Sequence, residues 1–185
     1  MAVRIYGNRE IKTLPGDATR PTSARVREAV FNIWQGRILG CRWLDLCAGS
    51  GAMGAEALCR GAAVAVGIEK SGAACQVVTE NWQKVLKPEQ TFQVLKGDVI
   101  RQLTQLKGQN TAAAKGFDCI YFDPPYAGGL YDLVLAEVVD LLSPQAQIAV
   151  EYSEAHWQPQ QLLPTLTIVK EKRYGSTHLV FLRRR

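Results

Sequence analysis

The sequence predicts an α/β fold whose main part is a parallel sheet with right-handed crossovers. Short apolar runs alternate with helical segments through the middle of the chain, which is the pattern of repeated βαβ units. Turns rich in glycine, proline or acidic residues separate these runs. At 185 residues with 47% hydrophobic content, the chain can bury one good core, so we expect a single domain over residues 1–185.

An N-terminal extension over residues 1–40 is expected to precede a core over residues 41–185. The extension contains a short hairpin at 4–13 and a helix over 23–34 with Thr22 as its N-cap. The expected core elements are strand 43–47, helix 52–60, strand 63–68, helix 71–86, strand 91–95, helix 99–107, an exposed loop at 109–116, strand 117–122, helix 130–142, strand 146–151 and two final strands, 166–174 and 177–183, that turn at Gly175 and Ser176.

The tetrapeptide Asp123-Pro124-Pro125-Tyr126, which follows the apolar run 117–122, is the most informative motif. Consecutive prolines lack the N–H groups that a central strand needs, so the strand must end there. The Asp123 carboxylate and the Pro124 carbonyl are then two acceptors that can hold an exocyclic amino group, while the Tyr126 ring can stack on the base. The alternative is a strand end closed by a proline turn beside a packing tyrosine.

A glycine-rich turn joins the first core strand to the next helix, which is the layout of a nucleotide-cofactor site. Gly49, Gly51 and Gly54 match the spacing G-x-G-x-x-G, and glycine lets the backbone approach a ligand closely. This spacing alone fits a nicotinamide dinucleotide as well as S-adenosylmethionine. Asp45 favours S-adenosylmethionine, because an acid suits the ammonium of a methionine moiety and is awkward beside a pyrophosphate.

Two further acids follow the next strands. Glu69 stands where a carboxylate can bind ribose hydroxyls, the alternative being a solvated strand end. Asp98 can accept a hydrogen bond from an adenine amino group, cap the helix that begins at Val99, or do both.

Taken in order, these motifs resemble those of S-adenosylmethionine-dependent amino-methyltransferases with a Rossmann-like class I fold. Residues 19–33, TRPTSARVREAVFNI, closely resemble the N-terminal signature of the RsmD-type ribosomal RNA methyltransferases, which modify a guanine 2-amino group in small-subunit (16S) RNA. Residues 172–179 are similar to that family's final hairpin. Two positions depart from the pattern: Cys47 replaces a usual phenylalanine, and residues 6–10 are less basic and less glycine-rich than the family's opening hairpin.

The resemblance implies a mainly parallel seven-stranded sheet with an antiparallel C-terminal hairpin. It implies that the substrate is a guanine of 16S rRNA within an assembling small ribosomal subunit and that the enzyme is a monomer. To enter the site, this guanine would have to be flipped out or already unpaired. It assigns the catalytic role to Asp123, Pro124, Pro125 and Tyr126, and the binding of S-adenosylmethionine or its product S-adenosylhomocysteine to Asp45, Ala48, Gly49, Ser50, Gly51, Gly54, Glu69, Lys70, Asp98 and Val99.

The positive charge is concentrated at the two ends of the chain. Residues 1–42 hold eight Lys or Arg against three acids, residues 170–185 hold six against one, and residues 43–169 hold eight against thirteen. This division suits a phosphate-binding rim around an acidic pocket, the alternative being an ordinary solvated surface. We therefore expect RNA contacts from Arg20, Arg25, Arg27, Arg183 and Arg184.

Other classes of protein fit less well. A DNA adenine or cytosine amino-methyltransferase uses the same clamp but commonly carries an added recognition region. The function of a dinucleotide oxidoreductase does not explain the double proline. That of a non-catalytic RNA-binding assembly factor does not explain why the clamp and the glycine turn occur together. The five cysteines include no C-x-x-C pair, and neither His156 nor His178 has ligand-like neighbours in sequence, so no disulfide or metal is assigned. No apolar run approaches a membrane span and no signal peptide is evident, so we expect a cytoplasmic protein.

Overall fold

The computed structural model describes residues 2–14, 23–108, 116–125, 129–159 and 163–185. Its elements are β1 Ala2–Ile5, the 3-10 turn η1 Tyr6–Asn8, β2 Arg9–Lys12, α1 Ala24–Ile33, β3 Arg42–Leu46, α2 Ala52–Cys59, β4 Val64–Glu69, α3 Gly72–Val85, β5 Thr91–Lys96, α4 Val99–Gly108, β6 Phe117–Phe122, α5 Tyr131–Val138, the 3-10 turn η4 Val139–Leu141, β7 Leu142–Tyr152, β8 Leu166–Tyr174 and β9 Thr177–Arg184.

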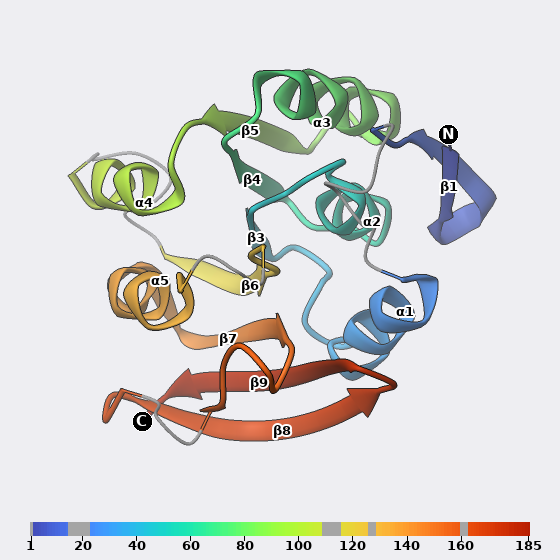
Figure 1. The fold of residues 1–185 in the computed structure, drawn as a ribbon. Helices are drawn as coiled ribbons and strands as arrows, with labels where there is room; N and C mark the ends of the chain where they lie inside the picture. The colour runs from blue at the N-terminus through green and yellow to red at the C-terminus, as the bar shows by residue number, and fades with distance from the viewer. Residues whose placement is uncertain (1, 15–22, 109–115, 126–128, 160–162) are drawn as a thin grey trace.

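Seven strands form one sheet in the order β5-β4-β3-β6-β7-β9-β8, and β1 and β2 form a separate hairpin. Strands β3 to β7 pair in parallel, whereas β9 pairs antiparallel with both β7 and β8. Helices α1, α2 and α3 cover one face of the sheet, and α4 and α5 cover the other (Figure 1). The predicted parallel sheet with an antiparallel C-terminal hairpin is therefore confirmed.

The strand order places a topological switch point between β3 and β6. From β3 the chain first builds outward through β4 and β5, and it then crosses back to place β6 on the other side of β3. The connections that follow β3 and β6 consequently leave in opposite directions, and the carboxyl ends of strands at such a point are where open α/β sheets generally bind their ligands. The glycine turn follows β3 and the proline segment follows β6, so the fold brings the two main sequence motifs to this one edge.

The N-terminal extension packs on the face that carries α1, α2 and α3. Its apolar side chains, among them Ile5, Ile11 and Phe31, share a buried cluster with Trp43 of the central strand. Asn81 of α3 fastens the hairpin, because its amide accepts from Lys12 N–H at 2.9 Å and donates to the Lys12 carbonyl at 2.9 Å. The same amide nitrogen donates to the carbonyl of Ser50 at 2.9 Å, so one buried side chain holds both the hairpin and the glycine turn.

Most element boundaries lie within two residues of those expected, and the exceptions have local causes. Helix α1 is capped by Ser23, whose hydroxyl accepts from Val26 N–H at 3.2 Å. The predicted cap Thr22 lies outside the described residues, and so do residues 109–115 of the predicted loop. Helix α5 ends at Val138 and tightens into a 3-10 turn. Strand β7 begins at Leu142, four residues early, because Leu142 pairs with Phe117 before the register shifts.

Candidate active site

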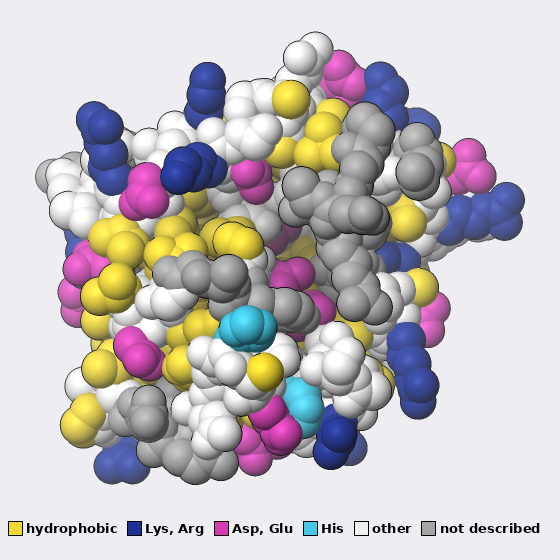
Figure 2. Space-filling view, viewed as in Figure 1, with side chains coloured by type: hydrophobic (Ala, Val, Ile, Leu, Met, Phe, Trp, Pro, Cys, Tyr) yellow, Lys and Arg dark blue, Asp and Glu magenta, His cyan; other side chains and the backbone are white. Residues whose placement is uncertain are grey.

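Acidic side chains converge at the carboxyl edge of the sheet, around the position where β3 ends. Burial is the main cause that raises the pKa of the Cys47 thiol to about 12, and the negative charges of Glu69, Asp123, Asp45 and Asp98 raise it further. Figure 2 shows Asp and Glu side chains in the hollowed centre of one face and Lys and Arg mostly toward its periphery. The predicted acids thus share one site, and its field favours a positively charged ligand.

Asp45 is the deepest of these acids. It is 2% exposed, and its carboxylate accepts a hydrogen bond at 3.0 Å from the backbone N–H of Gly54, in the first turn of α2. Burial raises its pKa to about 8; the Gly54 hydrogen bond opposes this shift, and the charge of Glu69 adds to it. A nearby cation would lower this raised pKa, because it favours the ionised form of the carboxyl.

The glycine turn contains one glycine that faces open space and two that make room for a tryptophan. A Cβ atom added to Gly49 would meet nothing within 4 Å, whereas one added to Gly51 would lie 2.7 Å from Nε1 of Trp82. A Cβ on Gly54 would lie 2.7 Å from Trp82 Cε2. The Trp82 indole is fixed there by its hydrogen bond to the Gly51 carbonyl, at 2.8 Å. The missing side chains of Gly51 and Gly54 thus make room for Trp82 of α3, and the predicted contacts of these two glycines with a cofactor stay predictions.

Glu69 holds the turn from the neighbouring strand. Its two carboxylate oxygens accept from Gly49 N–H at 2.9 Å and from Ser71 N–H at 2.8 Å. The alternative of a merely solvated strand end is therefore wrong, since the side chain positions the backbone of the turn. A carboxylate offers about four lone-pair positions, so these two bonds leave capacity for ribose hydroxyls.

Asp98 caps helix α4, which is one of the two roles predicted for it. Its Oδ1 accepts from the N–H groups of Ile100 at 3.1 Å and Arg101 at 3.2 Å, and the residue is exposed. Among the other predicted cofactor contacts, Val99 and Ser50 are buried, Ala48 is half-buried and Lys70 is exposed.

The proline segment lies where the sequence predicts it. Strand β6 ends at Phe122, and it is followed by a half-buried Asp123, a buried Pro124 and an exposed Pro125. Tyr126 lies outside the described residues. The clamp of Asp123 and the Pro124 carbonyl therefore remains a prediction from chemistry at a place that the fold supports.

Glu151 at the end of β7 is an acid of this edge to which the sequence analysis gave no role. It is 6% exposed, and its Oε2 accepts from the hydroxyl of Tyr121 at 2.5 Å. The sequence carries a signal for it, because Glu151 is the penultimate residue of parallel strand β7 and Glu69 is the last residue of β4, so both lie at the carboxyl edge.

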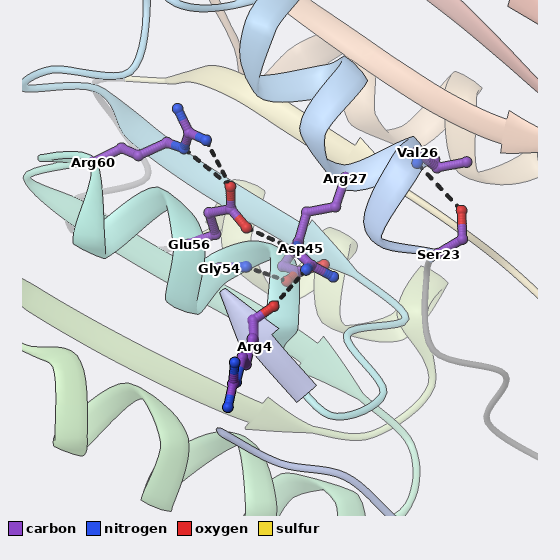
Figure 3. Close-up of polar contacts among 8 residues, drawn as sticks. All are labelled: Arg4, Ser23, Val26, Arg27, Asp45, Gly54, Glu56 and Arg60. Carbon is purple, nitrogen blue, oxygen red and sulfur yellow. Dashed lines mark hydrogen bonds and ion pairs between the residues drawn. The ribbon is translucent and has the colours of Figure 1, made fainter. Parts of the chain in front are cut away.

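Arg27 is buried and does not face the solvent, so its predicted contact with RNA phosphates is wrong. The side chain is 4% exposed, and Nε donates to Glu56 Oε2 at 2.6 Å while Nη2 donates to the carbonyl of Arg4 at 2.6 Å. Arg60 also binds Glu56, at 2.8 Å from Oε1. Figure 3 shows this cluster joining α1, α2 and β1. The physical reason is charge pairing: a buried carboxylate needs a cation, and Arg27 supplies it.

The remaining predicted RNA contacts lie in two separate places. Arg25 is exposed at the start of α1, with its guanidinium 5.6 Å from the ring centre of Tyr174 at the carboxyl edge. Arg183 and Arg184 end β9, which is antiparallel to β7, so they lie at the opposite edge of the sheet. The expectation of one basic rim around the pocket is therefore wrong for the C-terminal arginines. Arg20 lies outside the described residues.

Within the described ranges, no group of three or more His, Cys, Asp or Glu side chains is arranged to hold a metal ion. None of the helices in the same part of the chain is long and apolar enough to cross a membrane.

The edge defines the class of protein: a Rossmann-like class I methyltransferase fold, with a glycine turn after the first core strand and a proline segment after the fourth. The solved structure of the yhhF protein from Escherichia coli supports this, since it superposes with a TM-score of 0.80 at 29% identity and covers 100% of this chain and 98% of its own.

The chain belongs to the family described as "Conserved hypothetical protein 95", whose model matches residues 3–183. It is 31% identical to the YlbH protein of Bacillus subtilis over 179 residues, covering 96% of this chain and 94% of that one. It is 33% identical to the ribosomal RNA small subunit methyltransferase D of Escherichia coli K12 over 155 residues, covering 80% and 71%. The resemblance to RsmD-type rRNA methyltransferases is thereby confirmed at the level of the family.

Proposed function

We propose that the protein transfers a methyl group from S-adenosylmethionine to the exocyclic 2-amino group of a guanine in small-subunit ribosomal RNA. The observation that carries this proposal is the convergence of Asp45, Glu69, Asp98 and Asp123 around the glycine turn, beside the two prolines. The name of the Escherichia coli relative supports the RNA substrate. We place the reaction in the cytoplasm, on RNA within an assembling subunit, with a monomeric enzyme.

The residues present fit S-adenosylmethionine. The open side of Gly49 leaves space for a ligand next to the backbone, and Asp45 has a carboxyl whose ionisation a ligand ammonium would favour. We assign the ammonium to Asp45, the ribose hydroxyls to Glu69 and the adenine amino group to Asp98. When bound, the cofactor supplies a methyl group that its sulfonium already makes electrophilic.

The chain's own contribution is to position and stabilise the amine. The 2-amino lone pair of guanine is delocalised into the ring, so two acceptors that hold its N–H groups help the nitrogen to become pyramidal. We give this role to the Asp123 carboxylate and the Pro124 carbonyl. Positive charge develops on the nitrogen as it takes the methyl group from the sulfonium, and Asp123 stabilises this charge more strongly in the transition state than in the ground state. The nitrogen then loses one proton to Asp123 or to water, and S-adenosylhomocysteine is the leaving group. Tyr126 would stack on the base.

The test is product identification. The purified protein is incubated with deuterium-labelled S-adenosylmethionine and small-subunit particles from cells that lack it, and the RNA is digested to nucleosides for mass spectrometry. We expect labelled N2-methylguanosine, formed by the parental protein about a hundredfold faster than by an Asp123→Ala variant that still binds S-adenosylhomocysteine. Label on another nucleoside, or binding of a nicotinamide dinucleotide in place of S-adenosylhomocysteine, would overturn the proposal.

A further inference from the structure

Glu151 lies beside the predicted amine clamp. Strands β6 and β7 are parallel, and Phe122 pairs with Val150, so the next residues along each strand, Asp123 and Glu151, are level at the carboxyl edge. Neighbouring strands are about 4.8 Å apart. The fold therefore places a second carboxylate about one strand spacing from Asp123.

Two tyrosines fix Glu151 against the proline segment. The hydroxyl of Tyr121, two residues before Asp123, donates to Glu151 Oε2 at 2.5 Å. The hydroxyl of Tyr131, at the start of the helix that follows the segment, lies 3.5 Å from the Glu151 carbonyl oxygen. Glu151 is thus held from both ends of the loop that contains the clamp, and at 6% exposure it is shielded from bulk water.

A neutral residue would meet the packing needs of this position at lower cost. Gln147 lies four residues earlier on the same strand, and its buried amide oxygen accepts from Trp34 Nε1 at 2.8 Å. A buried carboxylate costs several kcal/mol in lost hydration unless it is compensated. A carboxyl group kept where an amide would serve, level with Asp123 at the carboxyl edge of the sheet, therefore indicates a role toward the ligand.

We propose that Glu151 accepts the N1–H of the target guanine and so determines the specificity of the site. This inference rests on the proposed function. The Watson–Crick edge of guanine presents two adjacent donors, N1–H and the 2-amino group, whereas adenine and cytosine present an unprotonated ring nitrogen beside their amino group. An ionised carboxylate only accepts hydrogen bonds. Asp123 would hold the amino group of any of these bases, but Glu151 would favour guanine and repel the ring lone pair of the others.

The probe is an RNA substrate in which the target guanine is replaced by 2-aminopurine. This base keeps the 2-amino group but has a lone pair in place of N1–H. Sites built to hydrogen-bond a substrate group reject analogues that lack this group by about 10⁴- to 10⁵-fold. We expect single-turnover methyl transfer by the parental protein to favour guanine over 2-aminopurine on the order of 100-fold or more.

The decisive variant is Glu151→Gln, because an amide can accept from N1–H of guanine or donate to the lone pair of 2-aminopurine. We expect the preference for guanine to fall to within about tenfold, equivalent to the loss of at least about 1.4 kcal/mol of discrimination. The matched control is Gln147→Leu, which removes a buried hydrogen bond from the same strand and should lower stability without changing the preference. Tyr121→Phe, which removes the hydroxyl that donates to Glu151 Oε2, should lower the preference partially.

The outcomes separate the two proposals. If the parental protein forms no N2-methylguanosine, the proposed function fails and this inference with it. If it methylates guanine but accepts 2-aminopurine equally well, only the inference fails. The same holds if Glu151→Gln, shown to be folded by circular dichroism and to bind S-adenosylhomocysteine normally, keeps the parental preference. Should Glu151→Gln not fold, an unchanged preference in Tyr121→Phe would overturn the inference.

Discussion

The buried cluster around Glu56 allows a quantitative prediction about stability. Glu56→Gln keeps the size of the side chain and one acceptor oxygen, but it removes the charge that faces Arg27 and Arg60. Arg60 is 21% exposed and keeps some hydration, whereas Arg27 is 4% exposed and depends on its partner. Removing one partner of a buried ion pair costs about 3–5 kcal/mol. We expect the lower end of that range, about 3 kcal/mol, because the amide oxygen still accepts one hydrogen bond.

For a domain of this size, a loss of about 3 kcal/mol lowers the melting temperature by about 6–12 °C. The assay is urea unfolding followed by far-ultraviolet circular dichroism, with thermal melts in parallel. The control is Glu80→Gln, since Glu80 pairs with Lys12 at 2.5 Å through side chains that are 40% and 70% exposed. Exposed pairs contribute little, so the control should leave the unfolding midpoint nearly unchanged.

A thermodynamic cycle gives the stricter test. Replacing both Arg27 and Glu56 by methionine leaves no uncompensated partner between them, so the double variant should be more stable than either single one. A stabilising buried ion pair between Arg27 and Glu56 is refuted if Glu56→Gln destabilises no more than Glu80→Gln, or if the two methionine replacements are simply additive.

Three further outcomes are expected. Affinity for S-adenosylhomocysteine should rise up to tenfold per pH unit between about pH 5.5 and 7, where the ligand ammonium stays protonated. The reason is that the pKa of Asp45 is raised to about 8, so this carboxyl must lose a proton when the ligand binds. Titration calorimetry checks this pH dependence, and Asp45→Asn should remove it. Gly54→Ala should destabilise the fold by about 1–3 kcal/mol through collision with Trp82, whereas Gly108→Ala, which meets nothing within 4 Å, should not, as urea unfolding will show. Asp123→Ala should lower single-turnover methyl transfer about a hundredfold or more with cofactor affinity nearly unchanged, and transfer at the parental rate would contradict the clamp.

The main architecture could be predicted because local signals and the global fold agree. Strand 117–122 and strand 166–174 match β6 and β8 at both ends, since consecutive prolines end the first and Gly175 turns the second with φ of +65°. The acids at Asp45, Glu69 and Asp98 could be assigned to one edge because parallel strands bring their carboxyl ends together.

The errors arise where a partner lies far away in the sequence. Arg27 shares helical spacing with Phe31 and Trp34, so its position on the apolar stripe was visible, but its partner Glu56 lies 29 residues later. Trp82, which requires two glycines of the turn, is equally remote. Arg183 and Arg184 were grouped with the N-terminal arginines by charge alone, and charge does not reveal the antiparallel direction that carries them to the other edge.

The Asn81 amide, which joins the hairpin to the glycine turn, has a consequence for cooperativity. If the hairpin detached, the Asn81 amide would lose its two hydrogen bonds to Lys12 inside the protein. Asn81 would then no longer be held in place where it donates to the Ser50 carbonyl of the glycine turn. The extension and the glycine turn should therefore open together in native-state hydrogen exchange, as one unit with a shared free energy of opening. A truncated chain that begins after α1 would keep the glycine turn and the acids of the carboxyl edge, yet it would lack the hydrogen bonds by which the hairpin and Asn81 hold that turn rigid.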